Sequence, residues 1–279
     1  MEKVHIEKNT VQETLVIPLY GRKLCTEQFP NLFQDKKAVE LTNCLDYDFS
    51  ALEKQSKSTA HRFGALEVAM RENDMMIELK EYLSRYPGAT LVNLGCGLDQ
   101  TAENCDNGKC RIVNIDLPDV IAVRNELLPG TDRIKNVGCD LNDTSWFDEI
   151  DALHGVCFMA AGVFYYFKTE DIKKLFTAMA KRFPGGKLVF DAANKRAVKI
   201  MLKTWVKEAG ITSISDYFCV NNVKKDLSWM EGAEISSKGH MLGYNDLKDP
   251  SVPGLFHLMA KLGDGFMKMQ IIRMDFKEK

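Results

Sequence analysis

The sequence predicts an α/β protein built on a mostly parallel sheet. From residue 88 onward, short apolar runs alternate with amphipathic stretches, a pattern typical of strands joined by helical crossovers. A Gly-Cys-Gly turn follows the first apolar run, at the carboxyl end of a strand, where parallel sheets bind ligands. The final apolar run has no helix after it, so we expect an antiparallel strand at the edge of the sheet.

Seven segments carry the strand signal. Five apolar runs indicate parallel strands, and amphipathic stretches indicate helices between them, two of which end at a Pro-Gly pair. The last run alternates apolar and polar residues, and an earlier segment is its expected neighbour. The expected strands are 91–97, 111–117, 133–141, 155–164, 187–193, 233–242 and 268–276, and the expected helices are 65–83, 119–128, 171–183, 196–209 and one within 251–263.

The first part of the chain has a different character. Apolar residues recur there at helical spacing until Pro87-Gly88 ends the last helix. No repeat or low-complexity linker separates this part from the rest. We therefore expect residues 1–87 to form a helical cap within the same domain as the core, 88–279, with lid insertions near 194–222 and 243–267.

Composition excludes several classes of protein. The 279 residues are 45% hydrophobic and 27% charged, and the formal net charge of −2 comes without a basic stripe, so we expect no nucleic-acid partner. No apolar run reaches the roughly 20 residues of a membrane span, and charges interrupt the first twenty residues. The eight cysteines and five histidines lack metal-site spacing. We expect a cytoplasmic protein without a metal or a membrane partner.

The glycine turn leaves two cofactors open, a nicotinamide dinucleotide and S-adenosylmethionine. Gly95 and Gly97 supply two glycines of the dinucleotide pattern, but Gln100 stands at the third place. Asp116 ends the second strand and suits the ribose hydroxyls of either cofactor. Asp140 follows the third strand and can accept from an adenine amino group. Together these residues resemble the class I S-adenosylmethionine-dependent methyltransferases, which have a Rossmann-like fold.

A longer series of motifs narrows this resemblance. It consists of ETLVIPLYGR…LFQDKKA (13–38), VNLGCGLDQT (92–101), NIDLP (114–118), GCDL (138–141) and AAGVFYYF (160–167). The series covers most of the chain and resembles the family of leucine carboxyl methyltransferases and tetracenomycin polyketide O-methyltransferases. Family members carry an NLGAGLDT-like turn, a V/IDLP segment and an AEGVLMYL-like segment.

The resemblance implies a set of cofactor contacts. Arg71 would hold the methionine carboxylate with its bidentate guanidinium, while Asp116 would hold the ribose and Asp140 the adenine. Ala161 stands where family members usually have Glu, which removes an acceptor near the cofactor's amino group. The implied cofactor-binding residues are Arg71, Gly95, Gly97, Asp116, Leu117, Asp140, Leu141 and Ala161.

The resemblance to the polyketide branch implies a small-molecule acceptor, and the chemistry of methyl transfer favours a carboxylate oxygen as its nucleophile. A carboxylate is already ionised at neutral pH, so methyl transfer to it needs no base. Tyr165 and Tyr166 are the candidates for orienting the acceptor, and Arg22 or Lys23 for neutralising an acidic one. Each of these side chains also has an ordinary interpretation as a packing or solvated residue.

Two other functions stay open at this point. One is an NAD-dependent reductase on a similar sheet. The other is a catalytically weakened S-adenosylmethionine-binding protein, motivated by Ala161. The identity of the acceptor, a small molecule or a protein C-terminus, and the oligomeric state are not determined by the sequence.

Replacing Asp116 by alanine tests the ribose contact. Loss of two charge-assisted hydrogen bonds should weaken S-adenosylmethionine binding by roughly 2–4 kcal/mol in Asp116→Ala. Titration calorimetry measures this difference, and an unchanged affinity would remove Asp116 from the site.

Overall fold

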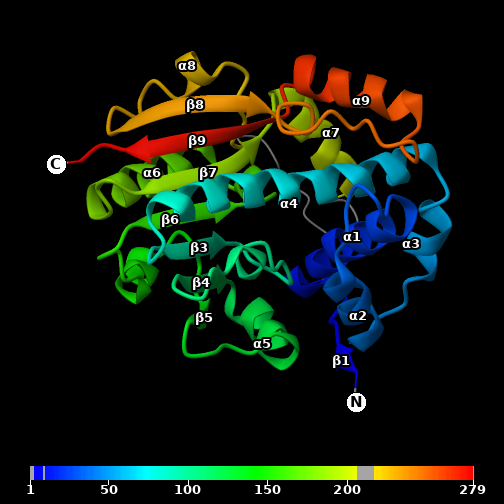
Figure 1. The fold of residues 1–279 in the computed structure, drawn as a ribbon, viewed down its shortest axis with the longest axis horizontal. Helices are drawn as coiled ribbons and strands as arrows, with labels where there is room; N and C mark the ends of the chain where they lie inside the picture. Colours follow the sequence, from blue (N-terminus) through cyan, green and yellow to red (C-terminus); the bar gives the residue numbers. More distant parts are fainter. Residues whose placement is uncertain (1–2, 9, 206–216, 279) are drawn as a thin grey trace.

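A seven-stranded sheet forms the centre of the protein (Figure 1). The computed structural model describes residues 3–8, 10–205 and 217–278. The strand order across the sheet is β5-β4-β3-β6-β7-β9-β8. The strands are β3 (Thr90–Leu94), β4 (Arg111–Asp116), β5 (Ile134–Gly138), β6 (Val156–Ala160), β7 (Lys187–Ala192), β8 (Ala233–Gly239) and β9 (Gln270–Phe276).

The strand directions and the strand order indicate which edge of the sheet can bind a ligand. All neighbouring strands pair parallel except β9, which is antiparallel to both β7 and β8. The predicted mostly parallel sheet with an antiparallel last strand is therefore confirmed. The chain runs outward from β3 to β5 on one side, and then continues on the other side of β3 with β6 and β7. The carboxyl ends of β3 and β6 thus flank the point where the strand order reverses, which is where open α/β sheets bind ligands.

Helices cover both faces of the sheet because its strands are apolar on both sides. On one face, Leu79 of α4 (Thr59–Arg85) packs in a cluster with Leu91. On the other face, Phe176 of α6 (Thr169–Arg182) packs with Val92 and Phe158. Neighbouring residues of a strand point to opposite faces, so Leu91 and Val92 belong to different clusters. Every residue of β3, β6 and β7 is buried, as expected of a doubly covered parallel sheet.

The N-terminal part packs beside the carboxyl edge and is mostly helical. Its α1 lies along α4, and the short strands β1 and β2 pair parallel with each other (Figure 1). The elements of this part before α4 are β1 (Val4–His5), η1 (Val11–Leu15), α1 (Val16–Gln28), α2 (Lys36–Cys44), β2 (Leu45–Asp46) and α3 (Ser50–Gln55). The remaining short elements and helices are η2 (Glu103–Cys105), α5 (Pro118–Leu127), η3 (Thr144–Glu149), η4 (Phe164–Tyr166), α7 (Lys195–Trp205), α8 (Val223–Asp226) and α9 (Gly254–Gly265).

Several expected elements have different bounds in the structure. The strand expected over 155–164 ends at Ala160, because Gly162 has a φ of 74° and a 3₁₀ turn follows it. A positive φ of this kind breaks a strand and is open to glycine without steric cost. The helix expected over 196–209 is present as α7 up to Trp205, and residues 206–209 lie outside the described part of the chain. None of the described helices has the length and apolar character to cross a bilayer.

Candidate active site

The glycine turn after β3 lies at the reversal point of the strand order. Gly95 and Gly97 have φ values of 65° and 48°, in the region that favours glycine. The backbone N–H groups of Gly95 and Cys96 both donate to the Ile115 carbonyl, at 2.8 and 3.1 Å, so the turn is fixed to the end of β4. A Cβ at Gly95 would lie 2.5 Å from a methyl carbon of Val163. The tight fit therefore requires glycine at position 95.

Apolar side chains cover both glycines in this structure. Val163 lies against Gly95, and Leu15 of η1 would be 3.1 Å from a Cβ at Gly97. Leu15 packs in a cluster with Leu98 and with residues of α5. A ligand that approaches the backbone of the turn must displace Val163 and Leu15.

Asp116 ends β4 with its carboxylate facing the glycine turn. One carboxylate oxygen accepts from the Gly97 N–H at 2.7 Å, and the other accepts from the Leu117 N–H at 2.8 Å. Burial raises the pKa of Asp116 above its ordinary value, against the opposing effect of these two N–H groups. A carboxylate oxygen can accept two hydrogen bonds, so each keeps capacity for one more donor. This arrangement fits the two neighbouring hydroxyls of a ribose.

Asp140 lies at the tip of the adjacent strand. The Cys139 N–H donates to the Asp116 carbonyl at 2.8 Å, which holds the two strand ends together. One Asp140 oxygen accepts from the backbone and side-chain nitrogens of Asn142, and the carboxylate is exposed. Leu117, which follows Asp116 in the chain, is 37% exposed, whereas Leu141 is buried in the core. The exposed carboxylate and the exposed Leu117 fit the amino group and the apolar face of an adenine.

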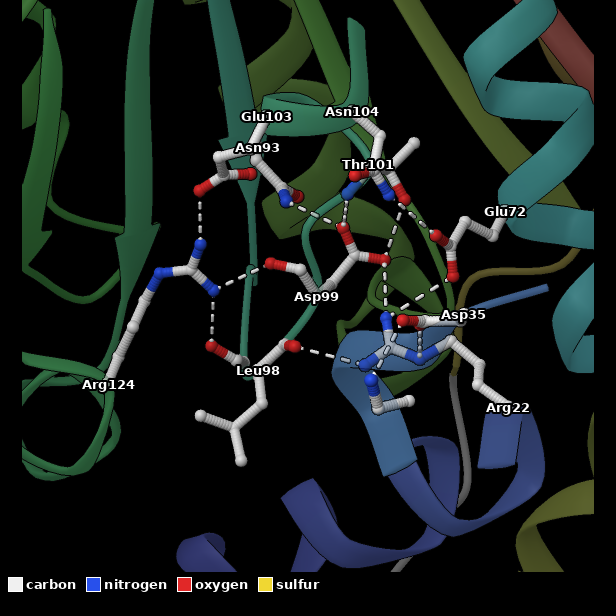
Figure 2. Close-up of polar contacts among 12 residues, drawn as sticks. Arg22, Asp35, Glu72, Asn93, Leu98, Asp99, Thr101, Glu103, Asn104 and Arg124 are labelled. Atoms are coloured by element: carbon white, nitrogen blue, oxygen red, sulfur yellow. Dashed lines mark hydrogen bonds and ion pairs between the residues drawn. The ribbon is translucent and has the colours of Figure 1, made fainter. Parts of the chain in front are cut away.

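Two buried arginines hold the chain that follows the glycine turn (Figure 2). Arg124 of α5 donates to the carbonyls of Gly97 and Asp99 at 2.8 and 2.7 Å, and also to Glu103. Arg22 of α1 reaches the turn from the other side and donates to the Leu98 carbonyl at 3.0 Å. The turn is therefore fixed between the N-terminal helices and α5 by backbone contacts from two fully charged side chains.

Arg22 lies among three carboxylates. Its guanidinium is 3.4 Å from Asp35, 3.3 Å from Glu72 and 3.5 Å from Asp99, and only 4% of the side chain is exposed. The expectation that Arg22 neutralises an acidic acceptor does not agree with this placement, since its charge is already surrounded by these partners. The alternative of a solvated Arg22 does not agree with it either. Lys23 points elsewhere, toward Glu27 at 4.0 Å.

Glu72 is the carboxyl group most affected by this network. Burial raises its pKa to about 8; Arg22 opposes the shift, and the charges of Asp99 and Asp35 add to it. Three carboxylates around one guanidinium leave an excess of negative charge in a buried place. A protonated Glu72 reduces this excess from two negative charges to one, because Arg22 then faces only the charges of Asp35 and Asp99.

The guanidinium of Arg71, a residue of α4, reaches the carboxyl ends of β6 and β7, where it lies close to Gly162. It donates to one oxygen of Asp191 at 3.2 Å, and the Gly162 N–H donates to the other at 2.6 Å. A Cβ at Gly162 would be 2.9 Å from an Arg71 nitrogen, so the guanidinium needs a glycine there. Tyr165 is buried, and burial together with the charge of Asp191 raises its pKa well above the ordinary value. Tyr166 is 43% exposed, and burial of its hydroxyl raises its pKa too.

His240 joins this region from the segment after β8. Its Nδ1 lies 2.9 Å from Asp74, and its Nε2 lies 3.2 Å from the Glu67 carbonyl. Both partners are acceptors, so both ring nitrogens must carry protons for the two bonds to form. Burial opposes the charged ring, but the hydrogen bond and charge of Asp74 outweigh it and raise the pKa of His240.

Sequence reasoning missed Asp191, Glu67, Asp74 and His240. The signal for Asp191 was its position at the carboxyl end of a buried strand, beside the tip that carries Ala161. No local pattern marks the other three, because they meet through α4 and a segment some 170 residues later in the chain. The structure brings Gly95, Gly97, Asp116 and Asp140 together along adjacent strand ends, and the cofactor roles of the predicted residues stay predictions.

Comparison with known proteins identifies the family. A family model described as leucine carboxyl methyltransferase matches residues 19–180, more than half of the chain. The chain belongs to this family. The predicted family is therefore confirmed, and with it a methyltransferase that uses S-adenosylmethionine is favoured over an NAD-dependent reductase.

Sequence comparison finds a curated relative, the tetracenomycin polyketide synthesis O-methyltransferase TcmP from Streptomyces glaucescens. It is 28% identical over 183 residues, which are 65% of this chain and 66% of the relative. The match spans just under two thirds of the relative's length, so its activity is not transferred to this chain as a whole.

Two solved structures share the family's fold at low sequence identity. A DUF574 family protein from Streptomyces avermitilis has a TM-score of 0.58 and 12% identity, covering 91% of this chain and 96% of that one. A protein from Thermobifida fusca described as a methyltransferase has a TM-score of 0.56 and 12% identity, covering 92% and 94%. At this identity the likeness concerns the fold alone, and it agrees with the Rossmann-like fold predicted for the family.

Removal of the Arg22 guanidinium should destabilise the protein. Arg22→Met leaves three carboxyl groups without their buried cation, and we expect the free energy of unfolding to fall by about 3–5 kcal/mol. Urea denaturation measures the loss. Lys23→Met is the matched control, because the neighbouring, half-buried Lys23 makes only a long pair with Glu27, and loss of its charge should cost less than about 1 kcal/mol. Equal effects of the two variants would contradict the bracing role of Arg22.

Glu72 should make stability depend on pH. Its pKa is about 8 in the folded protein against an ordinary 4.5, so the unfolded chain releases the proton first as the pH rises. The Glu72 contribution to stability therefore falls between about pH 4.5 and 8 and is level above that. Glu72→Gln has no proton to lose, so its stability relative to the native protein should rise across this window. Urea denaturation from pH 5 to pH 8 measures the difference, and a constant difference would contradict the raised pKa.

Proposed function

We propose that the protein transfers the methyl group of S-adenosylmethionine to an oxygen of a small-molecule acceptor, with a carboxylate as the preferred oxygen. The observation that carries the proposal is the alignment of Gly97, Asp116 and Asp140 at the reversal point of the strand order. When bound, the cofactor supplies an electrophilic methyl group on a sulfonium, which leaves as a neutral thioether. The protein then has to hold the cofactor and the acceptor in line and exclude water.

The protonation states around Arg71 support a carboxylate acceptor. The tyrosines Tyr165 and Tyr166 have raised pKa values, so they stay protonated at neutral pH and serve as hydrogen-bond donors. Both ring nitrogens of His240 already have partners. A phenol or an alcohol would need one of these groups as a base, whereas an ionised carboxylate needs none.

The polyketide relative supports a small molecule rather than a protein C-terminus as the acceptor, since its name places it in the synthesis of a small molecule. The N-terminal residues 1–87 would act as a cap on the core 88–279, because η1 and α1 contact the glycine turn directly. The segments near 194–222 and 243–267 would serve as lids, and part of the first lies outside the described residues. All eight cysteines are free thiols, which supports a reducing, cytoplasmic location.

Binding and turnover together test the proposal. Titration calorimetry should show S-adenosylhomocysteine binding and no binding of NAD. S-adenosylmethionine with a labelled methyl group, incubated with a panel of carboxylic acids and phenols, should then label acids as methyl esters. NAD binding without S-adenosylhomocysteine binding would overturn the proposal. Cofactor binding without labelling of any compound would instead indicate a binding protein that has lost catalysis.

A further inference from the structure

Three charged residues of α4 face the ends of β6 and β7. Glu67, Arg71 and Asp74 follow one another at spacings of four and three residues, which places them on one side of the helix. Arg71 contacts Asp191 at the end of β7, and Asp74 contacts His240. Glu67 lies near both pairs: His240 Nε2 is 3.2 Å from its carbonyl, and its charge acts on both Arg71 and His240. The three residues thus lie on the side of α4 that contacts Asp191 and His240.

The carboxylate of Glu67 differs from its neighbours in lacking donors. Asp191 accepts from Arg71 and from the Gly162 N–H. Asp74 accepts from His240, the Met241 N–H and Asn245. Within the described part of the chain, the Glu67 carbonyl lies within hydrogen-bond distance of His240, whereas the Glu67 carboxylate receives no hydrogen bond. The side chain is half-buried, so this carboxylate is partly removed from water without a compensating donor.

The charges of the cluster do not balance. Glu67, Asp74 and Asp191 are three carboxylates, and Arg71 and His240 supply two positive charges. A fourth carboxyl group, Asp264, lies close enough to act on the same groups, and burial raises its pKa to about 7. Burial raises the pKa values of Glu67 and Asp74 too, and the four carboxyl groups of the region have only two cations to stabilise their ionised forms. A cation next to Glu67 would stabilise its carboxylate.

We propose that Glu67 accepts the ammonium group of the cofactor's methionine moiety while Arg71, one helical turn away, binds its carboxylate. The inference rests on the proposed function, since it concerns how S-adenosylmethionine is held. An amino-acid moiety carries an ammonium and a carboxylate on the same carbon, and Glu67 and Arg71 present the opposite charges side by side. Ala161 at the tip of β6 offers no side-chain acceptor for the ammonium. Glu67 supplies one from the helix instead.

Two ligands that differ only in the amino-acid moiety test this contact. S-adenosylhomocysteine carries the ammonium and the carboxylate, whereas 5′-methylthioadenosine has the same adenosine and thioether without them. In Glu67→Gln, the affinity for S-adenosylhomocysteine should fall roughly 10- to 100-fold, as expected for one charged hydrogen bond. The affinity for 5′-methylthioadenosine should stay unchanged. Titration calorimetry on the full chain measures both.

A control on the same helix separates the local effect from a general change of charge. Glu81 lies on α4 and pairs with Arg85 at the surface, so Glu81→Gln should alter neither affinity. Glu67→Asp keeps the charge on a shorter side chain, so it should lose less affinity for S-adenosylhomocysteine than Glu67→Gln. Retained 5′-methylthioadenosine binding also shows that a variant is folded.

Each outcome separates the inference from the function on which it rests. If the native protein binds both ligands and Glu67→Gln binds S-adenosylhomocysteine equally well, the role of Glu67 is overturned and the proposed function stands. An equal loss of both ligands in Glu67→Gln would also overturn the inference, because a selective contact leaves adenosine binding intact. If the native protein binds neither ligand, the proposed function itself fails.

Discussion

The buried guanidinium of Arg22 is the contact on which the arrangement of the N-terminal helices and the glycine turn depends. It reaches from α1 to the Leu98 carbonyl and to the Asp99 side chain, while Arg124 holds the opposite side of the same segment. A turn with two residues at positive φ has few strong conformational preferences of its own. Arginine suits this task because its planar fork donates in several directions and its charge is never lost. The geometry of the candidate site is therefore set from outside the turn.

The candidate site combines two kinds of electrostatic environment. Near Asp116 and Asp140, the carboxylates accept backbone N–H groups and keep capacity for neutral donors such as hydroxyl and amino groups. Near Arg71, ionisable groups of both signs are crowded together, and carboxyl groups outnumber cations. An adenosyl cofactor has the same division, with a neutral, hydrogen-bonding nucleoside at one end and a zwitterionic amino acid and a sulfonium at the other.

Much of the fold could be predicted because the buried strands have a clear sequence pattern. Buried parallel strands read as continuous apolar runs, and the motif around Asp116 follows one of them directly. The role of Arg22 could not be predicted, because its partners Asp35, Glu72 and Asp99 come from three separate elements. A lone arginine in a helix reads as a surface residue until those partners are located. The same holds for Glu67, whose surroundings depend on a segment far along the chain.

A row of asparagines crosses the sheet beneath the glycine turn. Asn93, Asn114 and Asn136 occupy matching positions on β3, β4 and β5, and Asn114 donates to Asn136 at 3.0 Å. Apolar strands covered on both faces can slide past one another with little loss of burial, whereas a slip by one residue would turn these amides toward the opposite layer. The row thus favours one register between neighbouring strands. This register places the strand ends that bear Gly95, Asp116 and Asp140 at the same edge of the sheet.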